Sequence, residues 1–307
     1  YQVTTTVTRY TKSVWLTDKF KTAALDLNFA YNKSLTDSVS GNNLVTFSRA
    51  SGGTYVGADG LIKTATVNLL RHSENLSVWF RGSNSSVTAN QAVAPDGTTT
   101  ADRVQHPAVG SSWISQIGSV PGVTYTVSVY AKAVTPGTND QFTFQLGFTS
   151  PIFTATDEWQ RFTFTGTATG GSVYINNSSD SFATDVYFWG AQLEEGPVAT
   201  EYIPTATTSA GAPRFDHDFA TRESLGLLME KATTNLLLKS EKLNEWIVGN
   251  GSSVTANQAV APDGTTTADR VQHGSGGSSW IRQDVLTSGV TYTVSVYAKA
   301  VTPGTND

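Results

Sequence analysis

Residues 122–140 read GVTYTVSVYAKAVTPGTND, and this stretch decides the fold class. Apolar residues at odd positions alternate with mostly hydroxyl-bearing residues at even positions: Val123, Tyr125, Val127, Val129 and Ala131 against Thr124, Thr126, Ser128 and Tyr130. A period of two predicts a strand with one buried face and one exposed, hydroxyl-rich face. The Pro136-Gly137 pair then predicts a tight turn.

The same stretch recurs unchanged at residues 289–307, and residues 85–106 (SSVTANQAVAPDGTTTADRVQH) recur unchanged at 252–273. One offset of 167 residues relates both pairs, and it also relates Trp79 to Trp246 and Trp113 to Trp280. An internal repeat of this kind predicts an array of one module. The second copy ends at the position that corresponds to residue 140, so we expect this chain to be a piece of a longer polypeptide.

Composition narrows the function classes. Charged residues make up 15% of the chain and the net charge is -5, with no cluster of Lys and Arg, so a nucleic-acid partner is not expected. The chain contains no cysteine, which excludes disulfides, thiolate zinc sites and cysteine nucleophiles. No apolar run reaches the roughly 18 residues that a membrane-spanning helix needs, so membrane insertion is not expected.

Further short strands are predicted between turn signals, at residues 85–92, 98–105, 111–118, 142–148, 162–164, 171–177 and 184–194. In the fourth of these, Phe142, Phe144, Leu146 and Phe148 are expected to share one buried face. About eight strands suit a jelly-roll β-sandwich. We therefore predict an all-β chain of tandem jelly-roll modules joined by β-hairpin units, with the first module at 68–205 and a second, truncated copy at 235–307.

Two groups of segments resemble known families. Asn68-Leu-Leu, Trp79, GVTYTVSVYAKA, Trp159-Gln-Arg-Phe-Thr and VYFWGAQLEEG (186–196) follow an order that resembles the jelly-roll carbohydrate-binding modules found beside glycoside hydrolases. The flanking segments FSRASGGTYVGADGLIKTA (47–65), APRFDHDFATRESLGLLMEKATTNLL (212–237) and GAQLEEGPVATEYIPT (190–205) resemble bacteriophage virion proteins, especially tail-fibre and other fibre-like proteins.

The phage resemblance implies a domain plan. In the phage pattern the first flanking hairpin runs directly into the second, whereas here a whole module separates them. We therefore expect residues 44–67 and 206–234 to form one discontinuous β-hairpin unit into which the first module is inserted. Residues 1–43 would be an N-terminal segment that docks on other virion proteins, and the protein would be a fibre or tail appendage of the virion. Phage fibres are usually symmetric trimers, which implies a homotrimer.

Glycan binding is the activity that the module resemblance implies. Sugar rings stack on aromatic faces, and their hydroxyls need amide or carboxylate partners. The candidates in the first module are the aromatic Trp79, Trp113, Tyr130, Tyr187 and Trp189, with the polar Gln116 and Gln192, and their second-copy matches are Trp246, Trp280 and Tyr297. The alternative is that most of these side chains belong to the core, since Trp is highly buried on average. Tyr130 is the favoured candidate because it lies on the polar side of its strand.

Catalysis and metals find little support in the sequence. The four histidines, of which His106 and His273 occupy one repeat position, suggest no nucleophile with an adjacent base. We therefore predict no enzyme activity and no cofactor. Asp96, Asp102 and Asp185 lie near turns where related modules hold structural calcium, so they are calcium candidates. Two alternative functions stay open: a secreted or cell-surface polysaccharide-binding protein, and a capsid or tail decoration protein without a ligand.

Overall fold

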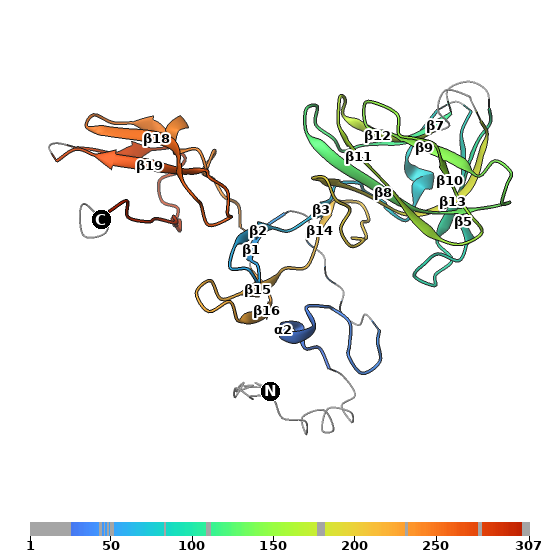
Figure 1. Cartoon of the computed structure of the whole chain (residues 1–307), viewed down its shortest axis with the longest axis horizontal. Helices are drawn as coiled ribbons and strands as arrows, with labels where there is room; N and C mark the ends of the chain where they lie inside the picture. Colours follow the sequence, from blue (N-terminus) through green and yellow to red (C-terminus); the bar gives the residue numbers. More distant parts are fainter. Residues whose placement is uncertain are drawn as a thin grey trace. The chain divides into compact units, whose positions relative to one another are not determined.

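The computed structural model describes residues 26–42, 45, 47, 49, 52–82, 84–108, 112–176, 182–230, 233–275 and 278–302. Regular structure in these ranges is almost entirely β-strand, so the chain is an all-β protein, as the sequence predicts (Figure 1). The single-turn helix α2 (Phe29–Asn32) lies within the predicted docking segment, of which residues 1–25 and 43 fall outside the described ranges. No helix of the described residues is long and apolar enough to cross a membrane.

The chain divides into two compact units. One consists of Thr46–Gly53 and Thr64–Pro213, and the other of Tyr1–Val45, Thr54–Lys63 and Arg214–Asp307. The predicted first module, residues 68–205, falls within the unit formed by residues 46–53 and 64–213. This unit also contains a short ladder, in which β3 (Val67–Asn68) pairs with β14 (Ala210–Gly211).

The first module is a sandwich of two five-stranded antiparallel sheets. We call the sheet with strand order β10-β9-β12-β7-β4 the front sheet, and the sheet with order β11-β8-β13-β6-β5 the back sheet. The front strands are β4 (Phe80–Arg81), β7 (Trp113–Ile117), β9 (Gln141–Gln145), β10 (Phe153–Thr154) and β12 (Ser172–Asn176). The back strands are β5 (Ser86–Ala92), β6 (Ala101–His106), β8 (Thr124–Ala133), β11 (Gln160–Thr167) and β13 (Thr184–Glu195). Consecutive strands often change sheet, which is the jelly-roll pattern that the sequence predicts.

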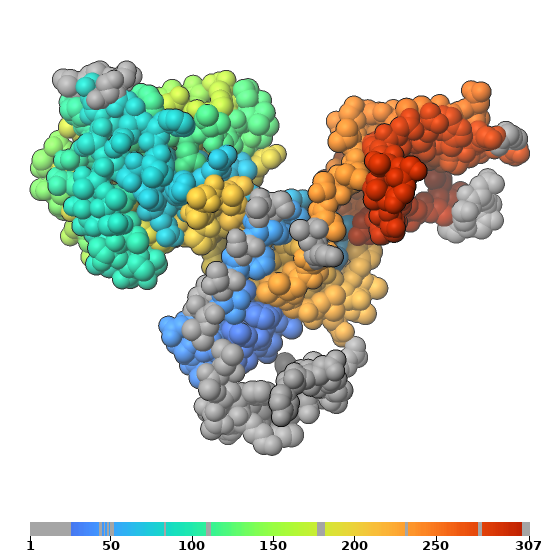
Figure 2. Space-filling model, turned by 180° about the vertical axis from the view of Figure 1, so that it is seen from behind, coloured from blue at the N-terminus to red at the C-terminus, as the bar shows by residue number. Residues whose placement is uncertain are grey.

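Aromatic side chains fill the space between the two sheets. The ring of Phe142 lies 4.9 Å from that of Phe188, 5.2 Å from Phe162, 5.6 Å from Phe153 and 5.7 Å from Phe144, measured between centroids. Three of these four contacts are edge-to-face, the geometry that aromatic rings favour. Each fully buried Phe contributes about 1.5–3 kcal/mol of transfer free energy, so this cluster stabilises the contact between the two sheets. Figure 2 shows the outer surface of this module, whose residues run from light blue through green to yellow.

Phe148 was expected on the same buried face, and that expectation is wrong. Strand β9 ends at Gln145, and the chain turns at Gly147, whose φ is +110°. The turn carries Phe148 outward, where its side chain is 50% exposed and packs edge-on against Phe164. The alternation predicts the inward side of a strand but not the residue at which the strand ends.

Strand β8 departs from its predicted pattern on the polar side. Thr126 and Ser128 were expected to be exposed, but both are buried. The Thr126 hydroxyl donates to the carbonyl oxygen of Gly196 at 2.8 Å, and Arg161 Nη2 donates to Ser128 Oγ at 2.9 Å. The segment after β13 therefore lies over this face. Periodicity identifies which side chains point away from the core but not whether another part of the chain covers them.

The two ends of the module meet at a structure that we call the neck, formed by β3 and β14. Val67 pairs with Gly211 and Asn68 with Ala210. The fully buried Asn68 side chain anchors the neck to the sandwich, because its Nδ2 donates to the carbonyl oxygens of Ala191 and Ile203 at 3.0 and 2.9 Å. Its Oδ1 also accepts from the backbone N–H groups of Leu70 and Leu193, each at 3.1 Å.

The two hairpin segments contact each other in the other unit. They contain β1 (Thr54–Val56) and β2 (Ile62–Thr64), and then β15 (Phe215–His217) and β16 (Ser224–Leu227). The backbone of Val56 contacts two side chains of the second hairpin segment. Its N–H donates to Asp216 Oδ1 at 2.7 Å, and its carbonyl oxygen lies 2.9 Å from His217 Nδ1. A register shift between Asp216 and His217 allows both side chains to reach one residue. Arg214 adds a third link, because its Nη1 donates to the carbonyl oxygen of Thr54 at 2.8 Å.

The second copy reproduces the first part of the module. It contains β17 (Ile247–Val248), β18 (Ser252–Ala259), β19 (Ala268–His273) and β20 (Ile281–Arg282). The register of β18 with β19 is that of β5 with β6 displaced by the repeat offset, and it includes the same irregularity. Residues 289–302, which match β8 and the turn after it, form no strand.

Candidate functional site

The outer face of the front sheet gathers aromatic and uncharged polar side chains, and we call it the front face. Its residues alternate along each strand with core residues such as Ile114, Val173 and Ile175. The front face consists of Phe80, Trp113, Ser115, Ile117, Thr143, Gln145, Ser172, Tyr174 and Asn176. None of these nine side chains carries a charge.

Strand register aligns four of these residues in a row across the sheet. Phe80 pairs with Ser115, Ser115 with Tyr174, and Tyr174 with Gln145. Directly opposite residues on neighbouring strands lie about 5 Å apart, so the row runs roughly perpendicular to the strands. A second row joins Trp113, Asn176 and Thr143. Ser115, which lies between the two aromatic residues of the first row, is 5% exposed, and Tyr174 is partly exposed.

Two of the aromatic rings form a corner. The centroids of Trp113 and Tyr174 are 5.5 Å apart and the ring planes are 87° from parallel. Both side chains are partly exposed. The Tyr174 hydroxyl makes no hydrogen bond to another described residue, so it can donate to or accept from a ligand.

Amide and hydroxyl groups support this corner from one side. Asn176 Nδ2 donates to Gln145 Oε1 at 3.0 Å, and the Thr143 hydroxyl donates to the Asn176 side chain. Thr143 is fully buried and Asn176 nearly so, and their contacts fix the orientation of the Gln145 amide. Its Nε2 points away from this network and forms no hydrogen bond within the described part of the chain, so it can donate to a ligand.

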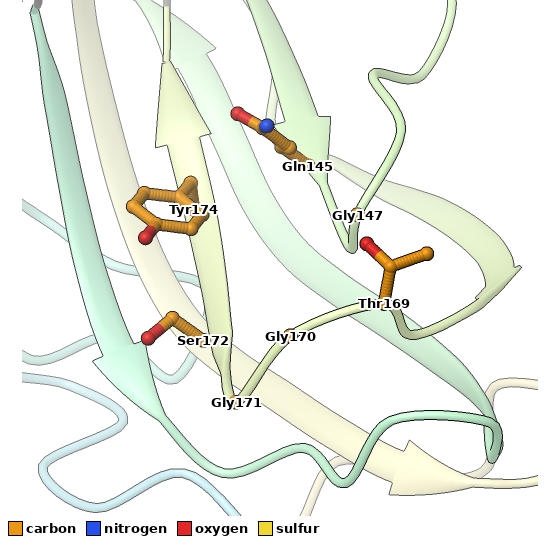
Figure 3. A pocket seen from close by; sticks show the side chains of 7 residues that line it. All are labelled: Gln145, Gly147, Thr169, Gly170, Gly171, Ser172 and Tyr174. Atoms are coloured by element: carbon orange, nitrogen blue, oxygen red, sulfur yellow. The ribbon is translucent and has the colours of Figure 1, made fainter.

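A hollow of about 210 Å³ lies beside Tyr174 and Gln145, the last two residues of the first row (Figure 3). It is lined by Gln145, Gly147, Thr169, Gly170, Gly171, Ser172 and Tyr174. Glycine is required at one position, because a Cβ on Gly147 would overlap the side chain and backbone of Thr169. The hollow is smaller than the roughly 300–1,000 Å³ of pockets that enclose a drug-sized ligand. It therefore suits one unit of a larger molecule that lies on the surface.

Three of the predicted ligand residues belong to the interior instead. Trp79 and Trp189 are each 4% exposed, and Gln192 is fully buried. The Trp189 indole N–H donates to Thr100 Oγ1 at 3.0 Å, and Gln192 accepts from the Ile203 N–H at 2.7 Å. These side chains present no face to a ligand, so they are corrected from candidate ligand residues to structural ones.

Tyr130, the favoured candidate, lies on the opposite side of the sandwich from the front face. Its ring packs against Trp189 and Tyr202 at 5.7 and 6.3 Å, and the guanidinium of Arg161 lies 5.6 Å from its centroid. Tyr130 is partly exposed, and these contacts fix the orientation of its ring on the back sheet. Tyr187, also on the back sheet, pairs with Arg103 and Lys132 and is partly exposed.

Gln116 is also committed to the fold. Its Oε1 accepts from the Arg71 N–H at 2.8 Å and its Nε2 donates to the Arg71 carbonyl oxygen at 2.5 Å. The Gln116 side-chain amide thus makes the two hydrogen bonds to the Arg71 backbone that a neighbouring strand would otherwise make, and it is not available to a ligand. Trp113 is the predicted first-module residue that the structure places on the front face.

The second-copy candidates are distributed differently. Trp246 is partly buried and its indole N–H donates to the Lys239 carbonyl oxygen at 3.1 Å, which repeats the environment of Trp79. Trp280 matches Trp113 and lies beneath the guanidinium of Arg282, 4.6 Å from the ring. Tyr297 is 69% exposed in a segment without strand partners.

The three calcium candidates lie in different hydrogen-bond environments. Asp96 accepts from the N–H and hydroxyl of Thr98, and Asp185 forms a two-point ion pair with Arg103 at 2.6 and 2.7 Å. Asp102 is buried and accepts three backbone N–H groups; burial raises the pKa of its carboxyl although these bonds act in the opposite direction. Within the described ranges no three His, Cys, Asp or Glu side chains come together as a metal site.

Sequence reasoning missed Tyr174, Gln145 and Asn176. A signal was available for Tyr174, because SVYIN at 172–176 alternates and places this ring on the side opposite Val173 and Ile175. No comparable signal exists for the amides, since their role depends on which strand lies next to which. Pairing of β12 with both β7 and β9 creates the front face.

No protein-family model matches the chain, and no curated protein is similar to it. Solved structures match parts of the chain at low identity and with low TM-scores. The xylan-binding domain CBM22-1 from Paenibacillus barcinonensis Xyn10C is 15% identical over 49% of this chain and 99% of its own, with a TM-score of 0.32. An arabinose-bound GH51 α-L-arabinofuranosidase is 13% identical over 49% of this chain, with a TM-score of 0.35. The enzymatically active domain of tailspike protein 4 from bacteriophage CBA120 is 15% identical over 42% of this chain, with a TM-score of 0.30.

The chain spans 32% of the arabinofuranosidase and 21% of the tailspike domain. At these identities and scores the likeness concerns the β-sandwich fold alone. What the chain binds has to be argued from its own residues.

Proposed function

We propose that the first module binds a neutral glycan on its front face. The observation that carries the proposal is the corner between Trp113 and Tyr174 beside an uncharged hollow and the oriented Gln145 amide. A sugar ring offers C–H groups on its faces and hydroxyls at its edges. The aromatic corner suits the faces, and the amide and hydroxyl groups suit the edges. An ionic ligand would find no opposite charge among the front-face side chains.

The angle between the rings limits the form of the ligand. Two planes 87° apart cannot both lie flat on one planar surface, such as the face of a crystalline polysaccharide. A single glycan chain can place one ring against Tyr174 while its edge meets Trp113. We therefore propose soluble or surface-displayed single chains as the ligand class. Binding of this kind needs no catalytic residue and no cofactor.

We further propose that the protein is a structural protein of a bacteriophage virion, in a fibre or tail appendage, and that the glycan belongs to the host surface. The support is the resemblance of residues 47–65, 190–205 and 212–237 to virion proteins, together with the linkage of the two hairpin segments at Val56. On this proposal residues 1–43 contact other virion proteins and the assembly is a homotrimer.

The test is binding of the full chain to a panel of soluble neutral polysaccharides: mannan, galactan, β-glucan and dextran. Affinity electrophoresis ranks the panel and calorimetry measures the best member. Tyr174→Ala and Trp113→Ala should each weaken binding at least tenfold, a loss of about 1.4 kcal/mol or more. Tyr174→Phe, which keeps the ring, should weaken it less. Addition of EDTA should leave the affinity unchanged.

Tyr187→Ala is the matched control, because it removes a partly exposed tyrosine from the back sheet. It should leave binding unchanged while the unfolding temperature shows that the module is folded. If Tyr187→Ala abolishes binding and Tyr174→Ala does not, the site lies on the back sheet and the front-face proposal is wrong. If no polysaccharide and no extracted host-surface glycan binds even a multivalent display of the chain, the module is architectural, as in a decoration protein.

A further inference from the structure

The two copies of the module are identical in some segments and differ in others, and three of the differences lie on the front face. Residues 85–106, which form β5 and β6 of the back sheet, are identical in the second copy. Strand β7 reads WISQI at 113–117, and the matching residues 280–284 read WIRQD. The edge residue Phe80 of β4 is replaced by Ile247 of β17.

The differences between β7 and the matching residues of the second copy all fall on the outer side of the strand. The core residue Ile114 is matched by Ile281, and the clamp formed by Gln116 is matched by Gln283, whose Oε1 accepts from the Leu238 N–H at 3.0 Å. Trp113 on the outer side is matched by Trp280. The other two outer residues are replaced, Ser115 by Arg282 and Ile117 by Asp284. The backbone arrangement is thus retained while an uncharged surface becomes a charged one.

The new charges are arranged around the retained tryptophan. The Arg282 guanidinium lies 4.6 Å from the centre of the Trp280 ring, close enough for a cation–π contact. Asp284 Oδ1 forms an ion pair with Arg282 Nε at 3.3 Å, and both side chains are more than half exposed. This contact engages Nε and leaves Nη1 and Nη2 without a hydrogen bond among the described residues. A guanidinium with two free parallel donors matches the two oxygens of a carboxylate.

We propose that the two copies recognise glycans of different charge: a neutral glycan on the first copy, and on the second a glycan that carries carboxylate groups. The inference rests on the proposed function, that this face of the module binds glycans. Arg282, placed over the Trp280 ring, would bind the carboxylate. Asp284 is a positioning residue that holds Nε, and its own charge repels any carboxylate that does not reach the two Nη atoms. The chain thereby engages a surface that displays both kinds of glycan through two sites, which increases avidity.

The experiment measures binding of the full chain to polygalacturonate, the carboxylate-bearing probe, and to the neutral polysaccharide identified above. Arg282→Ser should weaken polygalacturonate binding at least tenfold and leave neutral binding unchanged. Raising the salt from 0.05 to 0.5 M should weaken the first and spare the second. Arg270→Ser removes the same charge from the exposed part of β19 and is the matched control. Equal losses in Arg270→Ser and Arg282→Ser would show unspecific charge attraction and overturn the proposal.

The reciprocal substitutions test the proposal in the first module, where the front sheet has five strands. Ser115→Arg combined with Ile117→Asp gives the first module the outer residues of the second copy. The variant should lose neutral binding at least tenfold and gain binding to polygalacturonate. Retention of neutral binding without that gain would overturn the proposal. If Tyr174→Ala has no effect on neutral binding in the unmodified chain, the proposed function itself fails, so the two failures are distinguishable.

Discussion

Residues 85–106 and 252–273 have the same sequence and the same local structure, yet they lie in different surroundings. Both form a two-stranded ladder in one register, with a left-handed Asn at position 90 or 257. Both use one aspartate, Asp102 or Asp269, to bind the same backbone N–H groups across the hairpin. In the first module the side chains of β6 are largely buried, and in the second copy those of β19 are largely exposed or intermediate.

The second repeated stretch shows the opposite behaviour. In the first module residues 124–133 form the longest but one of its strands, between β11 and β13. The identical residues 291–300 form no strand, and Val296, the match of the fully buried Val129, is 77% exposed. The hairpin is determined by its own sequence, because its partner strand is adjacent in the chain. The long strand depends on two neighbours that come from residues 160–167 and 184–195.

Removal of the shared aspartate should give the largest difference between the copies. Asp102→Ala leaves the backbone N–H groups of Leu76, Ser77 and Asn90 without their acceptor inside the first module. We expect a loss of about 3–5 kcal/mol in the free energy of unfolding. Asp269→Ala acts in a more exposed hairpin and should cost about 1 kcal/mol. The measurement is hydrogen exchange of peptides from residues 141–205, which occur once in the chain and therefore report on the first module alone. Equal effects of Asp102→Ala and Asp269→Ala on these peptides would contradict the comparison.

Burial of the repeated histidine His106 should make the first module sensitive to acid. Burial lowers the pKa of His106 to about 4, whereas His273 at the same repeat position is exposed. Below pH 6.5 the unfolded chain takes up a proton that the folded module does not accept until about pH 4. Stability is therefore complete above pH 6.5 and falls across this window, by about 3 kcal/mol in total. Urea unfolding at pH 7 and pH 4 should show that His106→Gln removes most of this dependence and His273→Gln none of it.

The matched valines sharpen the comparison with a smaller effect. Val129→Ala deletes two methyl groups from the core and should cost about 2 kcal/mol. Val296→Ala makes the same deletion in the exposed stretch and should change stability by less than about 0.5 kcal/mol. Both are measured by urea unfolding of the full chain. A large effect of Val296→Ala would mean that residues 289–302 pack in a core of their own.

The first module could be predicted from its sequence to the level of its strands. Alternation in residues 123–131, 142–146 and 172–176 places the correct side chains in the core, since a period of two is a local property. Two of the predictions that failed involve contacts between distant segments: Thr126 donates to the Gly196 carbonyl oxygen, and Arg161 contacts Ser128. The failure at Phe148 is local, because strand β9 ends at Gln145 and the chain turns at Gly147.

The candidate site could be predicted less well for the same reason. A large aromatic side chain suggests stacking against a sugar ring, but the candidate residues differ in burial. Trp113 lies on the surface, whereas Trp79 and Trp189 lie inside. Which of these outcomes occurs depends on the strand that passes over each ring. Comparison of the two copies carries further information, because their differences in WISQI and WIRQD mark the outer side of one strand.

The neck also has a mechanical consequence. The chain enters and leaves the first module through two antiparallel strands that are joined at Val67–Gly211 and Asn68–Ala210. Tension applied to the polypeptide on either side would pull these strands apart from one end, so the pairs would break one after another rather than together. While the two residue pairs of the neck remain hydrogen-bonded, the force passes through the neck and not through the sandwich. Once the Asn68 anchor is lost, the pull would pass directly into β13, the central strand of the back sheet.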